Sequence, residues 1–225
     1  MLPEPGSTER TQVHRLSDRA VTDRSAMYDI LDSTVLCHIG YVESGQPFVL
    51  PYGFARHEDS ILIHGSTGAR FMRAMAAGAQ VCVTVTKLDG IVLARSTFDS
   101  SMNYRSVVIL GRAEEVTGEE KVSLMDAMSD GLMPGRVAEV RPSLKKELAA
   151  TMLLRLSLAE ASVKIRDGGV NEDQDGYASE AEFNAVWAGV IPLRTVADAP
   201  IPADDASASL ELPASVSAYL KGPKA

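Results

Sequence analysis

Short apolar runs with the pattern of β-strands recur along most of the chain, and they constrain the fold more than any other feature. Val81, Val83 and Val85 alternate with polar residues, as in a half-buried strand. Similar runs cover residues 34–42, 47–55, 61–63, 91–94, 104–116, 153–165 and 185–193. About seven strands with short connections and few helices favour a closed or nearly closed β-barrel over a parallel sheet. We therefore expect mainly β structure with flanking helices, the helices at residues 19–32, 119–128 and 142–150.

Glycines and prolines divide these runs into strands. Ser44-Gly45-Gln46 predicts a hairpin turn, and Asp89-Gly90 predicts a second one. Pro51 lies inside a strand pattern, which indicates an edge, a bulge or a place where a ligand replaces a neighbouring strand. Gly111 marks a bulge or a close approach of another chain segment.

One stretch, residues 61–75, joins a strand to a helix through a short polar turn. Ser66 to Gly68 form the turn, and Phe71, Met72 and Met75 give the helical spacing. A helix N-terminus offers unpaired N–H groups and a partial positive charge. Arg70 in the first turn opposes that charge unless an anion shares the site, which is the arrangement for a phosphate. The alternative is an ordinary cap by Ser66 or Thr67 with Arg70 in solvent.

Composition excludes several classes of protein. The 225 residues carry a net charge of −8 with a pI of about 5.0, which argues against a nucleic-acid partner but not against a small phosphate-bearing ligand. Cys37 and Cys82 match no metal-ligand spacing, so we expect buried free thiols and no metal site. No apolar run is long enough to span a membrane, and residues 1–10 do not resemble a signal peptide, so a cytoplasmic location is expected.

The pattern divides the chain into three parts. Residues 1–18 are expected to be a flexible arm, residues 19–195 the folded domain, and residues 196–225 an extended tail rich in Ala, Asp, Ser and Pro.

Four motifs in order carry a resemblance to a known family. They are Ile61-Leu62-Ile63-His64-Gly65 with Arg70, then residues 89–96, 103–113 and 186–193. Together they resemble the pyridoxamine 5′-phosphate oxidase-like FMN-binding split barrels, and within them the nitroimidazole-resistance (Nim-like) branch. Residues 193–203 lack the Arg-x-His pattern of the true oxidases, so oxidation of vitamin B6 is not implied.

The resemblance implies a six-stranded split barrel that dimerises, with FMN in clefts at the interface; a deazaflavin or a haem in the same cleft is the alternative. Arg70 corresponds to the basic residue that holds the flavin phosphate. The resemblance also places other residues at the flavin, some of them across the dimer: Phe48, Val49, Leu50, Pro51, Ile63, His64, Gly65, Ser66, Arg105, Ser106 and Trp187.

Each of the polar candidates has a plainer interpretation. His64 is the candidate catalytic residue, because an imidazole near neutral pH orients a substrate carbonyl or relays a proton; the alternative is a packed, half-buried histidine. Arg105 as a solvated strand charge and Trp187 as a core residue are the corresponding alternatives.

The sequence therefore supports two classes of function. One is an FMN-dependent oxidoreductase acting on a small-molecule substrate, with nitroimidazole reduction as the activity that the resemblance suggests. The other is a non-catalytic flavin-binding or electron-carrier protein. In both cases the flavin supplies the redox chemistry and the protein supplies binding and orientation.

Overall fold

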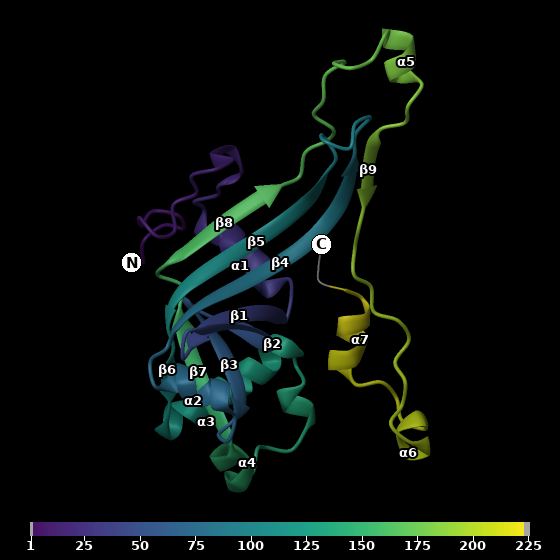
Figure 1. Ribbon diagram of the computed structural model, residues 1–225. Helices are drawn as coiled ribbons and strands as arrows, with labels where there is room; N and C mark the ends of the chain where they lie inside the picture. Colours follow the sequence, from purple (N-terminus) through teal and green to yellow (C-terminus); the bar gives the residue numbers. More distant parts are fainter. Residues whose placement is uncertain (1, 223–225) are drawn as a thin grey trace.

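The computed structural model describes residues 2–222, and antiparallel strands form its centre (Figure 1). Within that range the strands are β1 (Leu36–Glu43), β2 (Gln46–His57), β3 (Ser60–Ser66), β4 (Gln80–Leu93), β5 (Ser101–Arg112), β6 (Glu114–Val116), β7 (Thr151–Ser157), β8 (Ala161–Arg166) and β9 (Gly189–Pro192). Their order is β6-β7-β3-β2-β1-β4-β5-β8, with β9 added to β4. The predicted mainly β split barrel with flanking helices is confirmed.

The helices within the same range are α1 (Arg24–Asp32), α2 (Arg70–Ala76), α3 (Gly118–Leu132), α4 (Lys145–Ala150), α5 (Glu180–Asn184), α6 (Asp205–Ala208) and α7 (Ala214–Leu220), with 3₁₀ turns η1 (Ser17–Arg19) and η2 (Val137–Glu139). Helices α1 to α4 lie around the barrel, whereas α5 and α6 lie away from it (Figure 1). None of the helices described is both long and apolar enough to cross a membrane.

The core forms because the strand pattern alternates. In β2 the side chains of Phe48, Leu50, Tyr52 and Phe54 point to the barrel interior, whereas Val49 points outward. The hairpin from β1 to β2 closes through Ser44 and Gly45, both with positive φ (51° and 81°), as a tight two-residue turn requires. The predicted turn at this place is confirmed.

A second, smaller core lies on the outside of the barrel, under α3. Leu124 and Met128 of α3 pack on Leu62 and Leu153, whose side chains leave β3 and β7 on the face opposite to the interior. The helix approaches the strands so closely that a Cβ atom at Gly131 would overlap the Cβ atom of Ala55 in β2.

Gly131→Ala is therefore expected to destabilise the fold by about 1–3 kcal/mol, the usual cost of overpacking. In a helix without this contact the same change stabilises by roughly 1 kcal/mol, so the sign of the effect is diagnostic. Urea unfolding of the two proteins measures it, and a more stable Gly131→Ala protein would contradict the close contact.

Three strand predictions were wrong in detail. The Asp89-Gly90 pair does not turn the chain, because β4 continues through it beside β5 with only a shift of register between Leu88 and Gly90. Residues 153–165 are not one strand but the hairpin of β7 and β8. The last strand is shorter than predicted, and Trp187 lies before it.

One other detail agrees with the sequence, and the prediction of two buried free thiols agrees in part. A Cβ atom at Gly111 would come within 2.9 Å of Leu156 Cδ1, which confirms the close approach predicted there. Cys37 and Cys82 are free, the first buried and the second partly exposed, and burial raises the pKa of the Cys37 thiol to about 12.

The two terminal segments take different courses. The N-terminal segment follows the edge of β8, where Gly6 N donates to Ala161 O (2.7 Å) and Val21 N donates to Val163 O (3.1 Å). The C-terminal segment leaves β9, runs beside the barrel and ends in α6 and α7 (Figure 1). The predicted boundaries at residues 18 and 195 stay predictions.

Candidate functional site

The strands β2 and β3 separate halfway along their length, and this brings several of the predicted site residues together. β2 pairs with β1 from Gln46 to Gly53, but its pairing with β3 covers only 54–57. β3 instead continues on β7 up to Ser66. Among the described residues, no strand pairs with the other edge of β2 at 46–53. Pro51 therefore lies on an open strand edge, one of the three situations that its position in the sequence predicted.

Aromatic side chains form the floor beneath this opening. Phe48 stacks on Tyr41 with 5.4 Å between ring centroids, and Phe71 of α2 lies 5.0 Å from Tyr41 and 4.9 Å from Tyr52. Val49 and Pro51 lie on the outer side of the same strand and are exposed. The rings are tilted to one another by 25°, 54° and 45°, so they form an apolar floor beside the exposed edge rather than a flat stacking surface.

Arg70 is the first residue of α2, as the sequence indicated, but its guanidinium already has an anionic neighbour. Its Nε lies 3.1 Å from Glu43 Oε2, and its Cζ lies 5.3 Å from the centroid of the Phe48 ring. The side chain is 65% exposed, and neither Ser66 nor Thr67 caps the helix, since the N-cap is Ala69 without a side-chain bond. A phosphate at Arg70 would therefore displace or share the Glu43 ion pair.

His64 is half-buried near the end of β3. Its Nδ1 atom is buried and has no hydrogen-bond partner among the described residues, and burial lowers the pKa of the imidazole below its usual 6.5. Strand alternation places the side chain on the same face as Leu62. The imidazole is therefore neutral at pH 7 and has one ring nitrogen without a partner.

The glycine after His64 has a packing role that the sequence did not show. A Cβ atom at Gly65 would come within 2.9 Å of Met72 Cγ in α2, so the glycine allows the helix to lie on the strand. In the turn that follows, Ser66 Oγ accepts a hydrogen bond from Gly68 N (3.2 Å).

The remaining candidates lie elsewhere in the chain. Arg105 in β5 forms a two-pronged ion pair with Asp89, with N–O distances of 2.9 and 2.8 Å. This pair lowers the pKa of the Asp89 carboxyl. Ser106 Oγ is 3.5 Å from Lys164 O, and the Trp187 side chain is 66% exposed. The strands β1 and β4 separate β2 from β5, so one chain does not bring these three residues to Phe48 or Arg70.

The sequence analysis did not single out the partners of the two arginines, Glu43 and Asp89. Tyr41, Tyr52 and Phe71 were not predicted as site residues either, although their apolar periodicity in strand and helix was a signal that could have placed them below the ligand.

A family comparison identifies the fold. Residues 23–165 match the model of the pyridoxamine 5′-phosphate oxidase family. The chain belongs to this family. The match covers the barrel from α1 to β8 and includes β2, β3 and α2.

Solved structures of this family extend the likeness over nearly the whole chain. An FAD and haem binding protein from Mycobacterium smegmatis is 40% identical, with a TM-score of 0.83 over 89% of this chain and 96% of that one. The flavocytochrome Anf3 from Azotobacter vinelandii is 37% identical, with a TM-score of 0.85 over 96% and 98%. A candidate 5-nitroimidazole antibiotic resistance protein from Bacteroides thetaiotaomicron shares the fold at 18% identity, with a TM-score of 0.54 over 65% and 86%. No curated protein matches the chain.

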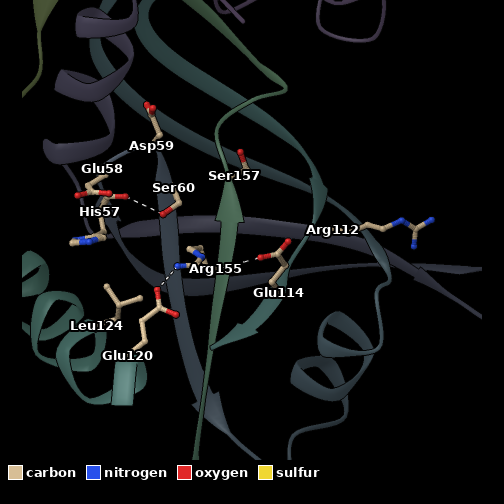
Figure 2. A pocket seen from close by; sticks show the side chains of 10 residues that line it. All are labelled: His57, Glu58, Asp59, Ser60, Arg112, Glu114, Glu120, Leu124, Arg155 and Ser157. Carbon is tan, nitrogen blue, oxygen red and sulfur yellow. Dashed lines mark hydrogen bonds and ion pairs between the residues drawn. The ribbon is translucent and has the colours of Figure 1, made fainter. Parts of the chain in front are cut away.

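This family member also has a charged pocket of about 300 Å³ at the opposite end of β3 (Figure 2). Figure 2 shows Arg155 between Glu120 and Glu114, at 2.6 and 3.9 Å, while Arg112 points away from them. Ser60 Oγ donates to the backbone oxygen of His57 (2.9 Å). None of the predicted site residues lines this pocket, and Arg155 is matched by its two carboxylates, so the opening at β2 and β3 is the better candidate.

Proposed function

We propose that this protein binds a flavin and a haem and works as a flavin-dependent oxidoreductase. The observation that carries the proposal is the likeness, at 40% and 37% identity over most of the chain, to an FAD and haem binding protein and to a flavocytochrome. The flavin would be FAD, as named for the first of these, rather than the FMN that the family resemblance suggested. A deazaflavin is a third possibility for the same cleft.

The open edge of β2 has the groups that a flavin needs. Phe48, Val49, Leu50 and Pro51 offer an apolar strand along which the ring would lie, and Arg70 offers a guanidinium for phosphate. Ile63, Gly65 and Ser66 come from the adjoining end of β3. Arg105, Ser106 and Trp187 would reach this flavin only from the second subunit of a homodimer.

His64 is the residue that would hold the iron of a bound haem. Iron binds a neutral imidazole, and burial of His64 favours its neutral form by lowering its pKa. Its buried Nδ1 has no hydrogen-bond partner among the described residues. His14 and His38 are exposed, and His57 lines the charged pocket at the other end of β3. At Gly53, one residue beyond the last β2–β3 pair (Phe54 opposite Ile63), a Cβ atom would meet only Val35 O at 3.9 Å. A bound haem would supply one-electron chemistry beside the two-electron chemistry of the flavin.

The decisive experiment is an absorption spectrum of the purified protein with mass identification of the released cofactors. We expect flavin bands together with an intense Soret band, and the mass of FAD. Flavin without a Soret band would remove the haem from the proposal, and a colourless protein that takes up neither cofactor would overturn it. Anaerobic turnover with NAD(P)H and a nitroaromatic acceptor then separates an enzyme from a carrier. The cytoplasmic location stays a prediction.

Arg70→Ala is expected to weaken flavin binding by about tenfold to a hundredfold, since a hydrogen bond to a charged group contributes roughly 1.5–3 kcal/mol. The fold should be unaffected because the side chain is largely exposed. Glu43→Gln is the matched control: it frees Arg70 from its carboxylate and should leave flavin affinity equal or higher. Fluorescence titration measures both, and an unchanged affinity in Arg70→Ala would return Arg70 to a surface role.

A further inference from the structure

The C-terminal extension, residues 167–222, is ordered beside the barrel but contributes almost nothing to the core. Ser215 is its one buried residue, and every residue from Ile191 to Leu212 is exposed. We call residues 191–212 the strap. Figure 1 shows the strap running from β9 down to α6 at a distance from the barrel. It lies beyond residue 165, where the family match ends.

Hydrogen bonds hold the extension at both ends. Above the strap, β9 pairs with β4, from Gly90 opposite Pro192 to Leu93 opposite Gly189. Below it, Ser215 of α7 donates to Glu139 from its backbone nitrogen (2.9 Å) and from Oγ (2.5 Å). These hydrogen bonds hold the pKa of the Glu139 carboxyl below its usual range. The strap is therefore suspended between two fixed points.

The strap exposes large apolar side chains, which a free surface does not usually do. The exposed fractions are 69% for Val196, 94% for Ile201, 71% for Leu210 and 51% for Leu212. Together these side chains leave apolar surface on the strap that a covering molecule would bury.

The charge of the extension restricts what that molecule is. Residues 167–222 contain ten acidic and two basic side chains, a net charge of −8, which equals the net charge of the whole chain. Two such extensions would repel one another. The barrel, which is close to neutral, is the compatible surface.

The barrel has an apolar groove of about 800 Å³ on its outer side. Gly40 forms its floor, where a Cβ atom would have no neighbour nearer than Cys82 O at 3.5 Å. Val42 and Val49 stand at its sides, 62% and 66% exposed, and the Arg112 side chain lines it with Arg10 and Glu160. The valines of this groove would contact the apolar side chains of a segment, and its two arginines would lie near acidic neighbours in that segment.

We propose that the strap of one protomer lies in this groove of a second copy, and that the second copy returns the contact. In a dimer with a twofold axis, each strap covers the groove of the other chain, so both straps and both grooves are buried by one assembly. A foreign partner would have to match the strap and the groove separately. Phe48 and Val49 line the groove and also belong to the candidate flavin site, so each strap bounds the site of the partner. The contact does not depend on which cofactor is bound.

The test places a photo-cross-linking amino acid, p-benzoylphenylalanine, at Ile201 in the full chain. A mixture of ¹⁴N- and ¹⁵N-labelled protein is irradiated after refolding or subunit exchange, and the joined peptides are identified by mass. We expect mixed-isotope products that join the strap to peptides containing residues 36–53 or 80–88. Links within one chain, links between two straps, or no links to these peptides would overturn the proposal.

Variants give an independent measurement in solution. The double variant Ile201→Asp/Leu210→Asp should raise the dimer dissociation constant at least about tenfold, since it replaces two apolar side chains that the contact would bury by charged ones. Ala203→Asp/Ala206→Asp, at two exposed strap positions with the same change of charge, is the control and should have little effect. Light scattering across a dilution series reports the constant. A dimer equally stable in Ile201→Asp/Leu210→Asp and in the control would contradict the role of the strap, whether or not a cofactor is bound.

Discussion

Replacing His64 by glutamine is expected to abolish the Soret band of the purified protein while its flavin spectrum stays. Glutamine fills a similar volume but has no imidazole nitrogen for iron. Changes to residues that merely orient a ligand already lower metal affinity by about 10–100-fold, so loss of the ligand itself should exceed that range. Haem titration into protein produced without haem measures the effect.

His57→Gln is the matched control for this prediction. His57 is also a partly buried histidine of the β2–β3 hairpin, but it lines the charged pocket at the far end of β3. It should bind haem as the unaltered protein does. An unchanged haem affinity in His64→Gln would remove His64 as the ligand and leave the proton-transfer role that the sequence suggested. That role predicts loss of turnover, by about a hundredfold to ten-thousandfold, in a protein that keeps its flavin.

Much of the fold was predictable because strand alternation is a local property of the sequence. In β2 and β4 the alternation of apolar and polar residues predicts which side chains are buried. Gly45 marks a turn with positive φ, and Gly111 marks a close contact with a neighbouring side chain. The hairpin turn predicted at Asp89-Gly90 was wrong because this pair of residues occurs both in turns and in irregular strands. What decides between them is β5, a partner that lies about fifteen residues further along the chain.

The candidate site was predictable only in part. The start of the helix indicated Arg70, and the family resemblance added His64. The structure places Arg70 against Phe48 on β2, whereas His64 lies near the end of β3 on the face of Leu62. Sequence patterns do not reveal that Glu43 holds Arg70 or that Asp89 holds Arg105, because ion pairs depend on side chains that the fold brings together. The strap escaped prediction for a related reason: apolar residues in an irregular segment have no period that indicates what they contact.

The pH dependence of haem binding should also identify His64. A proton and the iron compete for the same imidazole, so affinity is constant while the ring is neutral and falls about tenfold per pH unit below its pKa. Burial lowers the pKa of His64 from its usual 6.5. The loss should therefore occur at lower pH than it would for an imidazole with the ordinary pKa of 6.5. Equilibrium titrations that follow the Soret band between pH 8 and 5 measure the onset.

A variant with an added ligand provides the comparison for this onset. In His64→Gly, free imidazole supplied in the buffer should restore haem binding. This free imidazole takes up its proton in bulk water, where no burial lowers its pKa. The loss of haem should then begin at a higher pH than in the unaltered protein. If both proteins lose haem over the same pH range, the desolvated environment of His64 does not control binding, and a group elsewhere in the site carries the pH dependence.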